Sequence, residues 1–471
     1  MKREFLIVVI VILFAGNLCA NVARNTVAAS VSSNLSSLSS DEHSLGVSIA
    51  VNTNEGFACY PVVATDGEGG IYVVWLNHIF QGEYDVYTQV FFAYSHDYGK
   101  SWSNEIIIND NPSIPVSCST PSIAIDKQND YIYVAWEDNR TGRTNIYVDK
   151  SVNHGMSFGP DVKINDNDGM AINPYGLKTV HIAVGDDGKV YVVWEDNRLS
   201  ADPNPNRSDI FLASSTDNGG TFGSNVMVNP PDSSSNCRFP WIAVNNAGVV
   251  YVAYTKQTYP LQDVCVARSV DGGGSFQTPV KVNDDSTGGY RGKKEITFSK
   301  SGKICVVWTD GRAGSGGKYW DIYFASSSDG GLSFSPNVRV NDDPLSPVGQ
   351  NTTQGTASLA VDSQESVYIV WEDFRNYNVT PTHRRDIYHS YSKDGMTFSK
   401  NVQVNYLPDA TEWNCADPSM VIDSEDNLYT VWSDTPYGGD NMYIYFALLP
   451  GRTIIVPDDY PTIQQAVDAA S

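Results

Sequence analysis

A short polar phrase recurs six times in the sequence, each time directly after a run of alternating apolar residues. The first copy, SHDYGKSW, occupies residues 95–102, and later copies begin at Ser151, Ser215, Ser269, Ser327 and Ser392. In the pattern S-x-D-x-G-x-x-(W/F), the aspartate accepts hydrogen bonds from turn amides, and glycine takes a backbone conformation that other residues disfavour. The repetition therefore predicts six tight turns of one design, each ending on a buried aromatic ring.

The third residue of each phrase is expected to shape its turn. These residues are Asp97, Asn153, Asp217, Asp271, Asp329 and Asp394. Two copies depart from the pattern, because the second carries asparagine in place of aspartate and the sixth, 392–398, is one residue shorter. Both departures keep the serine, the glycine and the final aromatic residue.

Each phrase belongs to a longer unit of short strands. A strand with period-two alternation and an aromatic end occurs seven times, 54 to 63 residues apart, at 71–75, 132–136, 190–194, 250–254, 304–308, 367–371 and 428–432. A short strand precedes each copy, and a further strand leads into the repeated phrase. Short alternating strands with turn signals at this period predict a β-propeller rather than a sandwich.

The strand count predicts the number of blades. First, second and third strands each occur seven times, but fourth strands follow only the six phrases. The upstream segment 46–52 resembles the fourth strand at 162–165, since both carry apolar residues before an asparagine. We therefore predict an all-β, seven-bladed propeller of four-stranded antiparallel blades. Residues 46–52 would supply the outer strand of the last blade and close the ring, which removes an open sheet edge.

The repeated phrase resembles the Asp-box, or BNR repeat, of sialidase-like β-propellers. The resemblance covers nearly the whole predicted ring and implies that the six boxes are structural rather than catalytic. Sialidases have six blades, so a six-bladed ring is the alternative to the seven blades that the strand count predicts.

The ends of the chain differ from the repeats. Residues 1–20 combine two basic residues, an apolar run and the tripeptide Leu-Cys-Ala, which is typical of a secretory signal and too short to span a membrane. Residues 21–45 are rich in Ser, Asn, Thr and Ala, as in a disordered leader. The propeller would then occupy 46–452. Residues 453–471 resemble the start of a pectate-lyase-type parallel β-helix, truncated or vestigial, because so short a segment cannot form a solenoid.

Charge and export limit the partners. The net charge of -23 argues against nucleic acid or an anionic membrane surface as a partner. We expect a secreted protein, extracellular or at the cell surface, without a membrane span in the mature chain. Six cysteines remain after residue 20, and their pairing cannot be read from the sequence.

The connections separate the two faces of the predicted ring. In a four-stranded meander, the first-to-second turns and the repeated phrases share one face, and the remaining connections share the other. Connections on this second face are long, for example 165–179, 195–208, 341–356 and 372–385. Long loops on a rigid scaffold commonly carry binding residues. We therefore expect any site on this long-loop face.

A charged motif, W-(E/T)-D-x-R, follows four of the second strands. Its charged residues are the candidates for ligand binding: Glu137, Asp138, Arg140, Glu195, Asp196, Arg198, Asp310, Arg312, Glu372, Asp373 and Arg375. One interpretation is a rosette of charges that grips a polar ligand. In the other, each aspartate braces its own turn and each arginine pairs with a nearby carboxylate and locks neighbouring blades. Repetition in four blades favours the second interpretation, because a site for one ligand needs unequal residues.

The resemblance also implies what a working sialidase would need. Family enzymes hold the substrate carboxylate with three arginines, and use a Tyr nucleophile assisted by Glu and an Asp acid/base. The first arginine belongs to an (F/Y)-R-I-P motif, but residues 58–61 read ACYP, and the nearest match is the CRFP of 237–240. The candidate catalytic residues are Arg238, Asp263, Tyr290 and Arg291.

These observations predict a binding or scaffold module for extracellular glycans or proteins, with an exo-sialidase-type glycoside hydrolase as the alternative. The seven histidines show no metal-ligand spacing, and we expect no metal site and no cofactor. The Asn/Asp-rich segments 165–168 and 283–285 carry oxygen ligands of the kind Ca²⁺ prefers, although hairpin polarity explains them more simply.

Overall fold

A computed structural model describes residues 48–53, 56–81, 85–110, 117–167, 180–199, 207–232, 234–286, 288–312, 320–343, 353–376, 383–405, 413–435 and 441–449. All of them belong to one compact unit, Ser44–Ser471. Within these ranges the chain forms strands, turns and loops but no helix. The expected signal at 1–20, leader at 21–45 and β-helix-like segment at 453–471 lie outside the described residues.

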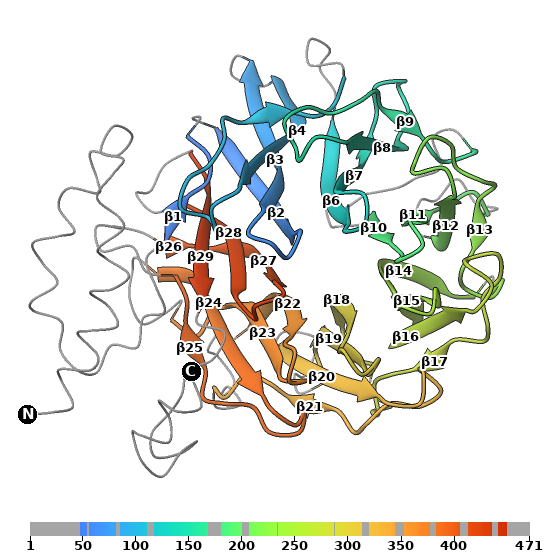
Figure 1. Ribbon diagram of the computed structural model, residues 1–471. Helices are drawn as coiled ribbons and strands as arrows, with labels where there is room; N and C mark the ends of the chain where they lie inside the picture. The colour runs from blue at the N-terminus through green and yellow to red at the C-terminus, as the bar shows by residue number, and fades with distance from the viewer. Residues whose placement is uncertain are drawn as a thin grey trace, which may run out of the picture. The chain divides into compact units, whose positions relative to one another are not determined.

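The strands form seven consecutive antiparallel blades around a ring (Figure 1). Blades 1 and 2 contain β2 (Phe57–Thr65), β3 (Ile71–Gln81), β4 (Asp85–Ser95) and β5 (Ile106–Ile107), then β6 (Cys118–Asp126), β7 (Tyr131–Asp138), β8 (Asn145–Ser151) and β9 (Val162–Lys163). Blades 3 and 4 contain β10 (His181–Val184), β11 (Val190–Asp196), β12 (Asp209–Ser215) and β13 (Val226–Met227), then β14 (Asn236–Val244), β15 (Val250–Thr258), β16 (Leu261–Ser269) and β17 (Val280–Lys281).

Blades 5 and 6 contain β18 (Arg291–Phe298), β19 (Ile304–Asp310), β20 (Asp321–Ser327) and β21 (Val338–Arg339), then β22 (Gln354–Val361), β23 (Val367–Asp373), β24 (His383–Ser392) and β25 (Val402–Gln403). Blade 7 contains β27 (Ala416–Ile422), β28 (Leu428–Asp434), β29 (Tyr443–Leu449) and β1 (Ile49–Ala50), while β26 (Trp413–Asn414) pairs with β24 outside this pattern. The seven-bladed prediction is confirmed, and the six-bladed alternative is wrong.

The ring closes where the N-terminal strand joins the last blade. In β1, Ile49 pairs with Phe446 of β29, and the pairing is antiparallel. The backbone N–H of Ile444 donates to Asn52 Oδ1 at 2.6 Å. An asparagine accepts a backbone N–H in the same way in blade 1, where Val90 donates to Asn109 Oδ1 at 3.0 Å. Residues 49–52 therefore occupy the place of a fourth strand, as the repeat predicted.

The core lies between the blades. The first strands follow one another around the centre of the ring, and β2 of the first blade contacts β27 of the last (Figure 1). The second strands contribute seven fully buried aromatic residues: Trp75, Trp136, Trp194, Tyr254, Trp308, Trp371 and Trp432. Burial of a large apolar side chain stabilises a fold by roughly 1.5–3 kcal/mol, so the seven interfaces, rather than any single blade, hold the ring together.

The repeated phrases form turns that dock on the preceding blade. In the first copy, Ser95 Oγ donates to Asp97 Oδ1 at 2.7 Å, and the Ser101 N–H donates to the same oxygen at 2.8 Å. Gly99 has a φ of 80°, and a Cβ there would lie 2.4 Å from the ring of Phe446. Side-chain hydrogen bonds from two serines lower the pKa of the equivalent Asp271 to about 2. Glycine is required both by the φ and by the close approach.

We expect Asn52→Ala to destabilise the protein because it removes the side-chain oxygen that accepts the buried Ile444 N–H. The loss should be about 1–3 kcal/mol in the free energy of unfolding, measured by urea denaturation. Asn109→Ala is the matched control in an interior blade, and it should lose a similar amount. An Asn52→Ala variant as stable as the wild type would contradict a stabilising closure.

Candidate functional site

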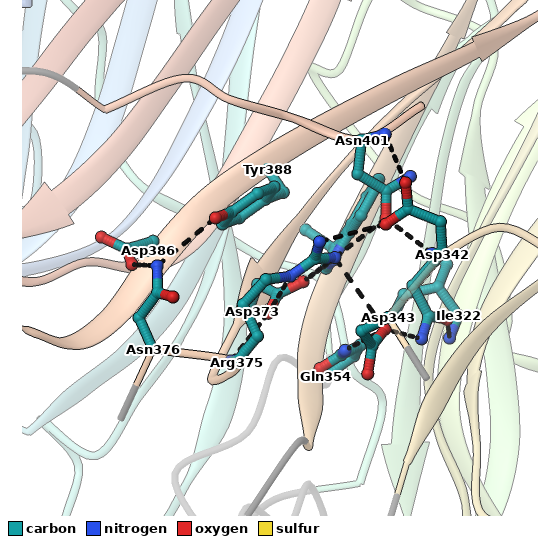
Figure 2. A network of polar contacts seen from close by, with 12 residues as sticks. Ile322, Asp342, Asp343, Gln354, Asp373, Arg375, Asn376, Asp386, Tyr388 and Asn401 are labelled. Atoms are coloured by element: carbon teal, nitrogen blue, oxygen red, sulfur yellow. Dashed lines mark hydrogen bonds and ion pairs between the residues drawn. The ribbon is translucent and has the colours of Figure 1, made fainter. Parts of the chain in front are cut away.

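The W-(E/T)-D-x-R motif of blade 6 forms an inter-blade contact (Figure 2). Trp371 Nε1 donates to Asp373 Oδ2 at 2.9 Å, and the Arg375 backbone N–H donates to Asp373 Oδ1 at 2.8 Å. The Arg375 guanidinium pairs with Asp373 at 2.7 Å and with Asp342, where the chain leaves blade 5, at 3.0 Å. It also lies 4.1 Å from the centre of the Tyr388 ring. One guanidinium thus joins two blades.

Two other blades repeat this contact, and a third makes it through an additional aspartate. The Arg198 guanidinium pairs with Asp196 at 2.6 Å and with Asp166 of the preceding blade at 2.5 Å. Arg312 likewise pairs with Asp310 at 2.8 Å and with Asp284 at 2.6 Å. The remaining member, Arg140, pairs with Asp138 and with Asp161 of its own blade, and Asp161 exchanges backbone hydrogen bonds with Asp110 of the preceding blade. The four arginines lie at four separate blade boundaries, so the structure does not gather them around one point.

The glutamates of the motif reach into the next blade. Glu195 Oε1 accepts the Phe239 N–H at 2.7 Å, and Glu372 Oε1 accepts the Asp417 N–H at 2.6 Å. Phe239 and Asp417 have φ values of 55° and 51°, so each glutamate holds a strained entry into an inner strand. Burial raises the pKa of Glu195 to about 7, against the hydrogen bond from Phe239. Burial and the charge of Glu195 raise the pKa of Glu137 to about 8, against a hydrogen bond from Ser119.

The four catalytic candidates lie in different surroundings. Arg291 is fully buried between Asp285 at 2.6 Å and Asp310 at 2.9 Å. Asp263 pairs with Lys281 at 2.7 Å, on the outer strands of blade 4. Tyr290 stacks on Trp320, with ring centres 4.6 Å apart, and the charge of the half-buried Arg238 acts on its hydroxyl. Arg291 and Asp263 are therefore engaged in separate ion pairs, and the four candidates do not share one contact.

A different set of side chains meets at the long-loop mouth of the central channel. The inner strands can be aligned by the residues with which they pair in the second strands. In this alignment, one position near the start of the inner strands is occupied by Tyr60, Thr120, Phe239, Lys293, Thr356 and Asp417. Lys293 Nζ donates to Asp417 Oδ1 at 2.9 Å and to Thr356 Oγ1 at 3.2 Å. The same ammonium lies 5.6 Å from the centre of the Tyr60 ring. Lys293 thus contacts residues from blades 1, 6 and 7.

The electrostatics of this cluster centre on the Lys293–Asp417 pair. Burial disfavours the Lys293 ammonium, but Asp417 and Glu372 outweigh burial and hold its pKa above the ordinary value. Burial, assisted by the charge of Asp417, raises the pKa of Tyr60 to about 12. The same two causes raise the pKa of Glu372. At neutral pH the cluster therefore presents a neutral Tyr60 phenol beside the Lys293 ammonium, which donates to Asp417.

Two cavities lie at the channel mouth and within the channel. A small cavity of about 10 Å³, enough for one water molecule, is lined by residues that include Phe239, Lys293 and Thr356. His181 and Trp241 also line it, with ring centres 3.8 Å apart and planes tilted by 37°. These two residues also line a larger cavity of about 350 Å³, whose walls come from all seven inner strands. The mouth is therefore a shallow polar site above a wider channel.

Sequence reasoning missed this cluster. Tyr60, Lys293, Thr356 and Asp417 stand in lead-ins that read YP, KK, TA and DP, which share no motif. The signal that could have found them is that these four residues differ in type at one aligned position of the repeat. That position can be recognised only when the strand register is known.

The described residues contain no group of three or more His, Cys, Asp or Glu side chains arranged to hold a metal ion. In the suggested Ca²⁺ segments, Asp166 pairs with Arg198 and Asp284 pairs with Arg312. The six cysteines of the described chain are buried thiols. No helix in this part of the chain is long and apolar enough to cross a membrane.

Comparison with known proteins places the chain by fold alone. No protein-family model and no curated protein matches the sequence. A protein of unknown function from Dyadobacter fermentans matches with a TM-score of 0.51 and 13% identity, covering 86% of this chain and 99% of that one. An ulvan lyase bound to a glucuronate–sulfated rhamnose glycan matches with a TM-score of 0.53 and 12% identity, over 88% and 99%. The intramolecular trans-sialidase of Ruminococcus gnavus has a TM-score of 0.45 and 12% identity, over 88% and 96%.

We expect Arg375→Met to destabilise the ring because it leaves the fully buried Asp373 without its cation. Loss of one partner of a buried pair costs roughly 3 kcal/mol, which urea denaturation would measure. Arg143→Met, at an exposed loop position, is the control and should be nearly neutral. Equal stability of the two variants would contradict a bracing role for the motif arginines.

The buried carboxyl of Glu137 predicts a pH dependence. Its pKa of about 8 in the folded protein exceeds the ordinary 4.5, so the folded state keeps a proton that the unfolded chain loses. The wild type should therefore lose stability as pH rises through this range. Glu137→Gln cannot ionise, and its stability relative to the wild type should rise with pH, by more than about 1 kcal/mol between pH 5 and pH 8. The difference should stay flat for Glu68→Gln at an exposed turn, and a flat profile for Glu137→Gln would refute the assignment.

Proposed function

We propose that this protein is an exported carbohydrate-binding propeller whose glycan site lies at the channel mouth around Lys293. One observation carries the proposal: Lys293 gathers unequal side chains from separate blades, whereas the repeated charged motif is taken up by contacts between blades. An asymmetric ligand requires unequal groups, and the mouth supplies them.

The chemistry of the cluster suits a sugar. Lys293 offers donors, Asp417 offers acceptors, and Thr356 and Tyr60 carry hydroxyls that both donate and accept. A sugar presents hydroxyls that do both, so it can bridge an ammonium and a carboxylate that already lie 2.9 Å apart. The ulvan lyase of similar fold is described as bound to a glycan, which supports this class of ligand.

Export is the second part of the proposal. It is supported by the signal-like segment at 1–20 and by the strongly acidic composition, both of which suit a secreted or cell-surface protein. A glycoside hydrolase of the exo-sialidase type is less well supported, because Asp263, the candidate acid/base, is engaged by Lys281 and Asn283.

Calorimetry on the purified chain tests the proposal with four probes: 3′-sialyllactose, oligogalacturonates, 1,5-arabino-oligosaccharides and ulvan oligosaccharides. We expect binding of at least one probe without turnover, checked by chromatography of the products. Lys293→Met should weaken that binding at least tenfold, or about 1.4 kcal/mol. The matched control is Lys127→Met, an exposed lysine that lines the larger channel cavity, and it should leave affinity unchanged.

Two results would overturn the proposal. Absence of binding to all four probes would contradict a glycan site. Turnover that disappears in Arg238→Ala and Asp263→Asn variants would instead favour the hydrolase.

A further inference from the structure

Blade 5 departs from the repeated motif where it approaches the mouth. Its motif reads WTDGR, so Thr309 replaces the usual glutamate and Gly311 replaces the larger residues of the sister blades. A Cβ on Gly311 would lie 3.0 Å from the backbone nitrogen of Tyr290 and 3.3 Å from Trp320 Cδ1. A Cβ on Gly292 would lie 2.9 Å from Tyr290 Cε1. The two glycines therefore make room for two aromatic rings.

The rings form a stack that is held in place. Their centres lie 4.6 Å apart and their planes are 25° from parallel. The Gly311 N–H donates to the Tyr290 carbonyl at 2.8 Å, and the Gln354 N–H donates to the Trp320 carbonyl at 2.9 Å. Arg291, the next residue, is anchored by two aspartates. The stack is thus organised before any ligand arrives, which lowers the entropic cost of binding.

The stack adjoins the mouth and reaches solvent. Tyr290 and Trp320 are both half-buried. Burial raises the pKa of the Tyr290 hydroxyl, and the charges of Lys293 and Arg238 oppose this rise, so both cations lie within electrostatic range. Tyr290 directly precedes β18, which carries Lys293, so the aromatic stack and the Lys293 cluster lie at the same end of blade 5.

We infer that Tyr290 and Trp320 bind the apolar face of a second sugar ring, next to one held at Lys293. The ligand is then a glycan chain of two or more residues rather than a single terminal sugar. This inference rests on the proposed glycan site. An aromatic face buries a large area at a small cost in conformational entropy, and the polar edge of the sugar remains free to reach Lys293 and Arg238.

Two series of oligosaccharides of increasing length, called length ladders below, test the inference. Oligogalacturonates and 1,5-arabino-oligosaccharides of one to six residues serve as probes, and calorimetry measures their affinities. In the wild type, affinity for the bound series should rise at least tenfold between one residue and three. Trp320→Ala should abolish this rise while leaving the affinity for the monosaccharide within about twofold, and Trp320→Phe should restore most of it.

Two further variants separate the ligand contact from folding. Trp102→Ala removes a half-buried tryptophan from a repeated phrase on the opposite face, and it should keep the full length dependence. Gly311→Asn introduces the residue that stands at this place in blades 2 and 3, displaces the stack and should flatten the ladder without removing either ring. Thermal unfolding of each variant confirms that it is folded.

The outcomes distinguish the two proposals. A ladder that still rises in Trp320→Ala and Gly311→Asn, or that is flat in the wild type, overturns the aromatic subsite and leaves the site at Lys293 standing. No binding by any member of either ladder overturns the subsite, and with the four-probe panel also negative it overturns the glycan site.

Discussion

Closure of the ring by the N-terminal strand is the constraint on which the rest of the structure depends. The first strands of the blades define the channel, and β2 lies beside β27 where β1 joins the last blade. One hydrogen bond that joins the two ends is accepted by Asn52 from the Ile444 N–H, which lies 392 residues away in the sequence. The geometry that each interior blade makes with its own asparagine is here made between the two ends. Every position at the mouth inherits its place from that closure.

The polar residues divide into two groups. Those that recur from blade to blade, such as Asp373 with Arg375, lie at boundaries between blades, where buried charge is matched by opposite charge within hydrogen-bonding distance. Those that do not recur, such as Lys293 and Asp417, lie at the channel mouth. A residue that recurs in several blades makes the same contact between blades each time. A residue that occurs in one blade alone has no equivalent elsewhere in the ring. This contrast is the physical basis for the proposed site.

Blade 5 shows how a repeat is altered to build a surface. Thr309 still bonds to the next blade, but its hydroxyl donates to the Gly355 carbonyl at 2.7 Å, whereas the sister glutamates accept a backbone N–H. The exchange removes a carboxylate from the neighbourhood of Lys293 while the contact between blades survives. Gly311, in the same motif, has no side chain and therefore leaves space for the stacked rings of Tyr290 and Trp320. Stability and recognition are thus separated within five residues.

The sequence by itself determined the repeat and therefore the fold. Alternating strands, turn phrases and the additional segment 46–52 were enough to predict seven blades and ring closure by that segment, because strand periodicity and turn chemistry are local properties. The contacts of Arg198 and Arg375 between blades also match one of the two interpretations of the motif, the one that its repetition in four blades favoured. Only the tertiary structure decided that Lys293, Thr356, Asp417 and Tyr60 meet. They stand in four blades, up to 357 residues apart in sequence, and what brings them together is the strand register and the curvature of the ring, which no short stretch of sequence encodes.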